Sequence, residues 1–396
     1  MKFTQFSDDN SESYFFSQPH QPFFILAFVN ALIAMIVFLL SYKGILNIDI
    51  SPVSFHAYSL IYLLFTPAFF AFLFTTFPRF ASTPIIEKKV YMKVFGVYYI
   101  GSILFLLGSI VSPFLSAVGM MTLFVGHVLG ALILKNIYTT TTMEDKQDIY
   151  WILLAMGMGV GSHFLFMLGE IFNLSLFSFS TEMASYLYLF LLAFAVAQRM
   201  VPFFSHCMVE KDTALLPKLF GLLVLHVLLE SIYTNASFIV DFAIVYLVAK
   251  ELLRWKLPFP NPNPLLTILH ISLYWVPVAF ALEGLTNLVS LFSDVTFLAL
   301  DIHLLLLGFV FTILIGFGTR VTIGHSGNMM QADKWVKYLF IWTQVVVGLR
   351  ILVSLVAAFG WNFMILFDIS ATAWLLMFIA WAVRFFAVLI TGKKLS

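Results

Sequence analysis

The chain has 396 residues, of which 61% are hydrophobic, only 10% are charged, and 46 are phenylalanine. Water-soluble domains carry roughly 25% charged residues, so this composition requires lipid as part of the solvent. The net charge of +1, with no basic arm or stripe, excludes nucleic acid as a partner. The single cysteine, Cys207, excludes an internal disulfide, a cysteine-rich zinc site and a cysteine-ligated iron–sulfur cluster.

The beginning of the chain differs in character from the rest. Residues 1–21 are polar and include Asp8, Asp9 and Glu12, which is unlike a cleaved secretory signal. We expect a polar cytoplasmic segment over residues 1–21 and a single transmembrane domain over residues 22–396. The first apolar run, from residue 22 to about residue 41, is long enough to be retained as a crossing helix.

Apolar runs of about 20 residues recur to the end of the chain, and each can cross a bilayer as a helix. The sequence therefore predicts an all-α, polytopic membrane bundle of about twelve transmembrane helices. The predicted spans are 22–41, 55–77, 92–112, 115–138, 150–173, 182–205, 215–233, 237–254, 265–289, 296–318, 336–358 and 363–390.

Charge asymmetry orients these spans. Of the 21 lysines and arginines, all but Lys43 and Arg350 fall on one side of the predicted topology. Because basic loops stay on the cytoplasmic side, both termini are predicted to be cytoplasmic.

Seven acids fall near the outer ends of different spans, which indicates either a polar outer chamber or solvated helix ends. They are Glu170, Glu182, Glu230, Asp241, Glu283, Asp301 and Asp368.

Six of the nine histidines lie inside predicted spans. They are His56, His127, His163, His226, His270 and His303. Titratable groups in a bilayer core are costly and usually face the protein interior, and imidazole is the commonest metal ligand. Their depths predict an outer site around His56 and His303 and an inner site around His270 and His325. His127 and His163 share a middle depth.

Each histidine also has a plainer interpretation, a hydrogen bond to a neighbouring helix. We favour that interpretation for His226, and leave both open for His127 and His163. The latter follows a glycine-rich run, Gly157 to Gly161, that admits either another helix or a flat macrocycle.

Five segments, in order along the chain, resemble motifs of the NnrS family of polytopic membrane proteins, which are associated with haem, copper and bacterial resistance to nitric oxide. The matching segments are 21–27, 55–57 with 72–78, 198–205, 264–270, and 303–308 running on to 319–327. The most specific is the last, which contains Thr319-Arg320 and Gly324-His325-Ser326-Gly327.

The resemblance implies a bacterial inner-membrane protein that binds b-type haem, with copper as a second metal and nitric oxide or its iron complexes as a ligand. Haem iron in a helix bundle is held by histidines of equal depth on different helices, and its propionates need cations. Candidate cofactor-binding residues are His56, His303, His270, His325, Arg320 and Arg199, with Arg350 as the outer arginine. Candidate metal ligands are His56, His303, His270, His325, His127 and His163. The alternative for the inner arginines is snorkelling to lipid headgroups.

One departure concerns the metals. Where the family pattern has His-Ala-His-Glu, this chain has His56-Ala57-Tyr58-Ser59. The second imidazole is missing, so one metal site is expected to be altered or lost, and copper is less firmly implied than haem.

Two other functions fit the span number. A secondary transporter of twelve spans would use the outer acids, but no inverted repeat is visible in the sequence. A terminal oxidase or nitric oxide reductase would need adjacent histidines for copper, and the sequence has no His-His pair. No nucleophile or metalloprotease motif occurs, so the sequence identifies no catalytic residue.

Overall fold

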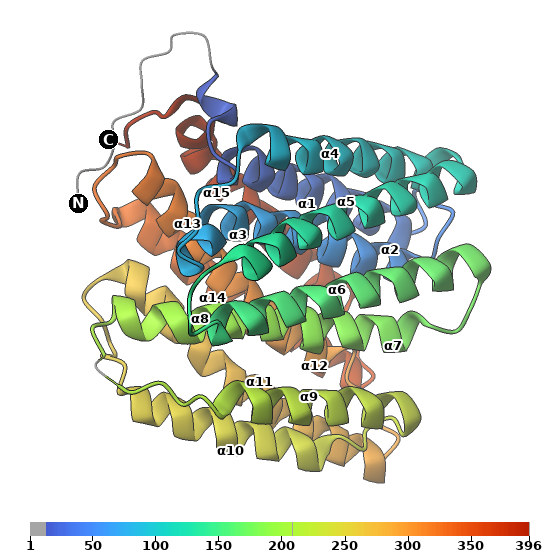
Figure 1. Ribbon diagram of the computed structural model, residues 1–396. Helices are drawn as coiled ribbons and strands as arrows, with labels where there is room; N and C mark the ends of the chain where they lie inside the picture. The colour runs from blue at the N-terminus through green and yellow to red at the C-terminus, as the bar shows by residue number, and fades with distance from the viewer. Residues whose placement is uncertain (1–12, 208, 396) are drawn as a thin grey trace.

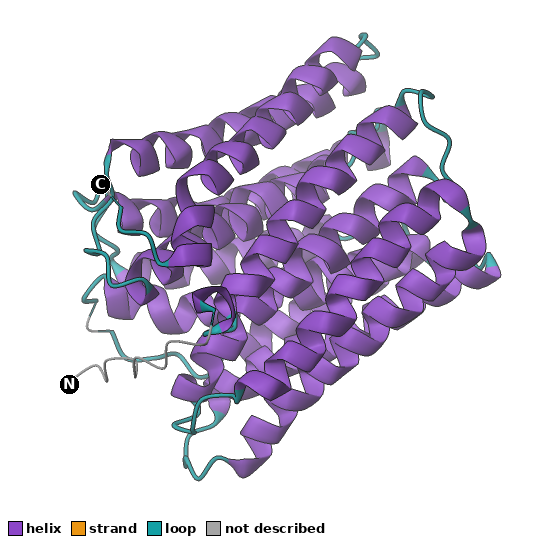
Figure 2. Cartoon of the chain, turned by 90° about the horizontal axis from the view of Figure 1, so that it is seen from above, coloured by secondary structure: helices purple, strands orange, loops and turns teal. Residues whose placement is uncertain are grey.

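The computed structural model describes residues 13–207 and 209–395, and every regular element in them is helical (Figure 2). After a short 3-10 turn, η1 (Tyr14–Phe16), twelve long helical rods run back and forth through the bundle. They are α1 (His20–Tyr42), α2-η2-α3 (Pro52–Phe80), α4 (Lys88–Val111), α5 (Pro113–Thr140), α6 (Gln147–Phe172), α7-η3-α8 (Phe177–Phe204), α9 (Leu215–Ile232), α10 (Phe238–Trp255), α11 (Pro264–Phe292), α12-η4-α13 (Leu300–His325), α14 (Lys334–Ala358) and α15 (Met364–Thr391).

The predicted all-α membrane bundle is confirmed. Within the described residues, eleven rods are long and apolar enough to cross a membrane. The twelfth, α10, is helical over the predicted range but carries Asp241, Lys250, Glu251 and Arg254. Both ends of the chain lie at the same end of the bundle, which we call the terminal end (Figure 1). Most of the polar segment expected over residues 1–21 lies outside the described residues, and α1 already begins at His20.

The prediction for the end of the tenth span was wrong. The span was expected to stop at residue 318, but α13 continues through His325. Its polar residues are satisfied inside the bundle, which explains the extension. Thr322 donates to the Gly318 carbonyl (2.8 Å), and the Trp381 indole donates to Thr319 Oγ1 (3.0 Å).

The twelve rods can be divided, in chain order, into three units of four, which begin at His20, Gln147 and Pro264. In each unit the second rod is the one that contains a π-helical segment. These segments are η2 (Ser59–Phe65), η3 (Met183–Phe190) and η4 (Leu304–Phe311). π-Helix is rare and is frequent at functional sites. Two of the segments end alike, because Thr66 and Thr312 each donate to the carbonyl five residues earlier, at 2.9 Å.

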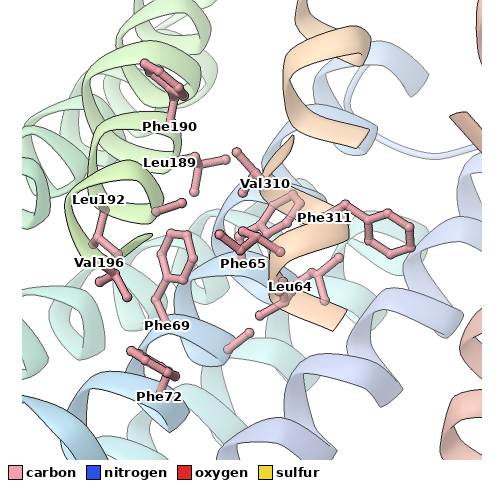
Figure 3. Packing of buried hydrophobic residues seen from close by; sticks show 14 of the residues in the cluster. Leu64, Phe65, Phe69, Phe72, Leu189, Phe190, Leu192, Val196, Val310 and Phe311 are labelled. Carbon is pink, nitrogen blue, oxygen red and sulfur yellow. The ribbon is translucent and has the colours of Figure 1, made fainter. Parts of the chain in front are cut away.

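These three π-containing rods form the centre of the molecule. Their most apolar windows are 94%, 72% and 72% buried, whereas the other candidate spans are between 33% and 61% buried. Their side chains interlock, with Phe65 and Phe69 of the first rod meeting Leu192 of the second and Val310 of the third in one apolar cluster (Figure 3). The remaining helices surround this core, with α4 and α5 at one edge and α9 and α10 at the opposite edge (Figure 1).

The α4–α5 pair is packed through glycine. A Cβ added to Gly119 of α5 would lie 2.4 Å from the backbone nitrogen of Phe105 on α4, and one added to Gly108 would lie 2.3 Å from the nitrogen of Ser116. Small residues let membrane helices approach to backbone contact, where van der Waals attraction holds them together.

Gly119→Ala should therefore destabilise the protein, because the methyl group meets backbone that cannot move aside. We expect a loss of about 1–3 kcal/mol, the usual cost of overpacking, seen as a lower thermal midpoint in detergent. Gly96→Ala on α4 is the matched control, since its Cβ would have nothing within 4 Å. Equal midpoints for the two variants would contradict the packing described.

Candidate cofactor and metal sites

The first site lies between the first and third central rods, towards the end of the bundle opposite the termini. His56 is near the start of α2 (Pro52–Tyr58), and His303 ends α12 (Leu300–His303), immediately before η4. Their imidazole rings are nearly parallel, at 13°, with centroids 6.2 Å apart. The Phe38 ring packs against His56 at 4.2 Å. The pairing expected from the sequence is thus brought together.

The loop before α12 fixes the orientation of His303. Ala299 has a left-handed backbone (φ 42°), which is strained for a residue with a Cβ. In this conformation its carbonyl accepts a 2.7 Å hydrogen bond from His303 Nδ1. We assign the ring proton to Nδ1, which leaves Nε2 as a lone-pair donor. A backbone carbonyl on the far nitrogen is the usual support of a metal-binding histidine.

Arg350 of α14 stands beside the same ring. Its Nη2 lies 3.2 Å from His303 Nδ1 and donates to the Leu298 carbonyl at 2.8 Å, while its Nη1 donates to Ser354. Guanidinium has five donors, so others remain for an anionic group. The outer arginine expected from the sequence is therefore next to the outer histidine pair.

A second polar group lies in the middle of the bundle and is completely buried. His127 of α5 and His163 of α6 face each other through their Nδ1 atoms, 3.2 Å apart. The other nitrogen of His127 lies 3.3 Å from Met156 Sδ, and the Tyr62 ring stacks on His163 at 3.8 Å. The glycine run before His163 receives a side chain of the neighbouring rod, because a Cβ on Gly159 would lie 2.6 Å from the Tyr188 ring.

Tyr58 completes this middle group. Its hydroxyl donates to His163 Nε2 at 2.8 Å. A consistent proton assignment then runs from Tyr58 through His163 and His127 to the Met156 sulfur. The phenol and the thioether lie at the two ends of this chain of contacts, on the far nitrogens of the imidazole pair, and all four side chains are buried.

The residues expected at an inner site lie near the terminal end, in separate surroundings. They are His270, His325, Arg199 and Arg320. His270 bonds Ser205 Oγ through Nε2 (2.7 Å), whereas His325 bonds Gln18 (2.8 Å) and stands beside the His20 ring, 5.0 Å between centroids. No contact between His270 and His325 is recorded among the described residues. The inner site remains a prediction.

The inner arginines already have partners of their own. Arg199 forms an ion pair with Asp148 at 2.5 Å, and Arg320 lies over the Phe204 ring at 4.2 Å.

In the loop after α8 (Leu191–Phe204), burial raises the pKa of the Cys207 thiol above its usual value, so the sole cysteine is a poor thiolate ligand.

A third group was only partly foreseen. Four of the seven outer acids lie around His226, a residue for which we had expected an isolated hydrogen bond. The imidazole is within 4 Å of Asp241, Glu283 and Glu182. Glu230 joins through Asn287 (3.4 Å). Asp368 instead pairs with Lys43 at 2.7 Å.

Comparison with known proteins identifies the family. Residues 14–393 match the family model described as NnrS protein. The chain belongs to the NnrS family. No curated protein matches it.

Two features of this NnrS chain were not found from its sequence. One is the recurring π-helical segment, because the length of an apolar run does not reveal the helix type within it. The signal for the acidic group was present in the equal depths of the acids, but the contact between His226 and Asp241 crosses from α9 to α10 and depends on the rotation of both helices.

Proposed function

We propose that this NnrS chain is an integral membrane haem protein that acts in bacterial resistance to nitric oxide, with the haem iron between His56 and His303. The observation that carries the proposal is the facing pair of parallel imidazoles, with centroids 6.2 Å apart. Imidazole nitrogens bind metals at about 2.0–2.1 Å. A metal between two such nitrogens therefore sets the ring centroids about 6 Å apart.

The surrounding residues suit this role. The Ala299 carbonyl holds the His303 tautomer that leaves Nε2 free, and Phe38 fixes the plane of His56. Arg350 offers a cation for a propionate beside the pair. When bound, a b-type haem would supply a redox-active iron that exchanges electrons or binds nitric oxide. The protein residues bind it, orient it and exclude bulk water.

In the proposed setting, the chain crosses the bacterial inner membrane with both termini in the cytoplasm. The haem pair then lies in the outer half of the bilayer, because α2 and α12 both begin at the end opposite the termini. The positive-inside distribution of lysine and arginine supports this orientation.

Replacing His56 or His303 by alanine should remove haem, because either change deletes one of the two imidazoles that would hold it. We expect haem per protein to fall about tenfold or more, scored by the Soret absorbance and by pyridine extraction of the purified protein. His206→Ala is the control, since His206 is exposed in a loop.

A monodisperse elution profile must accompany each haem measurement, so that lost haem is not confused with unfolding. Wild-type protein from haem-replete cells without a Soret band would exclude the proposal. Full haem content in both alanine variants would exclude this ligand pair.

Copper is the second part of the proposal and is assigned to the His127–His163 pair. The facing Nδ1 atoms of the two imidazoles, 3.2 Å apart, are nitrogen donors of the kind that binds copper, and the Met156 thioether and the Tyr58 hydroxyl contact the far nitrogens of the same rings. Tyr58 is the residue that stands where the family pattern has a second histidine. It supplies one neutral oxygen in place of an imidazole nitrogen.

Tyr58→His should strengthen copper binding, because it would add a third imidazole next to His163. We expect about tenfold tighter retention of one copper per chain during competition with a chelator, measured by elemental analysis. Tyr62→His is the matched control, since that ring stacks on His163 but donates its hydroxyl to Ser162. Tighter copper binding in both variants, or in neither, would contradict the assignment.

A further inference from the structure

The acidic group around His226 is built from four helices and lies apart from the haem and copper residues proposed above. His226 comes from α9, Asp241 from α10, Glu283 from α11 and Glu182 from the end of α7 (Phe177–Glu182). His226 and Asp241 have no exposed surface, Glu283 is 1% exposed, and the Glu182 side chain is 13% exposed. So many carboxylates are rarely buried together without compensating charge.

Asp241 orients the histidine. Its Oδ1 accepts a 2.7 Å hydrogen bond from His226 Nδ1. Its Oδ2 accepts from Ser237 at 2.8 Å and from Asn287 at 3.4 Å. Both oxygens are therefore occupied, and the imidazole is fixed with Nε2 pointing away from Asp241. This carboxylate–histidine pair is the arrangement found behind metal-bound imidazoles.

Three buried atoms at the other side of the imidazole have no hydrogen-bond partner in the described structure. They are His226 Nε2, Glu283 Oε2 and Glu182 Oε2. Nε2 lies 3.4 Å from Glu283 Oε1 and 3.8 Å from Glu182 Oε2. Ligand atoms about 2.0–2.2 Å from a shared ion are separated by such distances. Buried polar atoms are otherwise almost always paired.

Tyr186 adds a further constraint. Its hydroxyl donates to Glu283 Oε1, which fixes that carboxylate and leaves its second oxygen free. Tyr186 belongs to η3, the π-helical segment of the second central rod, and Glu182 is the last residue before that segment. The local change of helix type therefore places both side chains beside His226.

We propose that His226 Nε2, Glu283 and Glu182 bind a divalent cation, with Asp241 as the positioning residue behind the imidazole. One imidazole and two carboxylates suit Mn²⁺, Fe²⁺ or Zn²⁺, and they lack the soft thioether or thiolate that selects Cu⁺. The ion supplies the two positive charges that offset Glu182 and Glu283. It also gives each of the three unpaired atoms a partner.

The test uses the full-length protein, purified in detergent and stripped by a chelator. Mn²⁺, Zn²⁺ and, without oxygen, Fe²⁺ are added one at a time, and bound metal is counted by elemental analysis after desalting. We expect one equivalent of at least one ion per chain, held by wild-type protein. X-ray absorption of the loaded protein should show a shell of nitrogen and oxygen without sulfur.

Variants distinguish the proposed metal ligands from the residue that positions the imidazole. Glu283→Gln and Glu182→Gln should each weaken binding about tenfold or more, and Asp241→Asn should weaken it about 10- to 100-fold, as loss of a second-shell carboxylate does. Glu170→Gln is the matched control, since Glu170 lies on α6 outside the group. Haem content should stay at the wild-type level in all four, so this result is independent of the haem proposal.

Two outcomes would overturn the site. One is the absence of stoichiometric metal from all three titrations of folded, monodisperse wild-type protein. The other is equal metal binding by wild type, Glu283→Gln and Glu182→Gln. A protonated-carboxyl infrared band that disappears in Glu283→Gln, together with no metal binding, would show that protons neutralise the group instead.

Discussion

Buried polar groups cannot turn to water inside a bilayer, so every imidazole and carboxylate within this bundle must find its partner in the protein. The three central rods share one structural feature that places such groups beside partners. Each is α-helical where it enters from the end opposite the termini and then becomes π-helical. His56, Glu182 and His303 all lie at or just before that change. The widened turns direct polar side chains sideways towards neighbouring rods, while the apolar halves of the same rods form the core.

The architecture was readable from the sequence because it depends on one property, the length of apolar runs. Each of the twelve predicted ranges overlaps one helical rod, although the tenth rod runs on to His325. Equal depth also corresponds to closeness for two pairs of histidines. The rings of His56 and His303 lie 6.2 Å apart on two central rods, and His127 and His163 are in contact on neighbouring helices. For these pairs, depth and helix order together left few alternatives.

Depth does not determine which face of a helix a residue occupies, and here the sequence was insufficient. His270 and His325 were grouped by their nearness to the same boundary, yet each bonds a different partner, Ser205 and Gln18. His226 was expected to make an isolated hydrogen bond, because nothing in its own helix signals the carboxylates of three others. The recurring π-helical segment is likewise a feature of backbone geometry, which the length of an apolar run does not reveal.

Electrostatics ties the outer sites together. Asp301, two residues before His303, interacts electrostatically with both Arg350 and Glu182. Arg350 is thus a half-buried cation that interacts with Asp301, one of the outer acids. One guanidinium cannot balance several carboxylates in a medium of low dielectric, where unlike charges interact strongly and unpaired ones are costly. Neutralisation, by a metal ion or by protons, is therefore required at this end of the bundle. The proposed ion beside His226 would supply positive charge, and it would leave Arg350 free to face the anionic edge of the proposed haem.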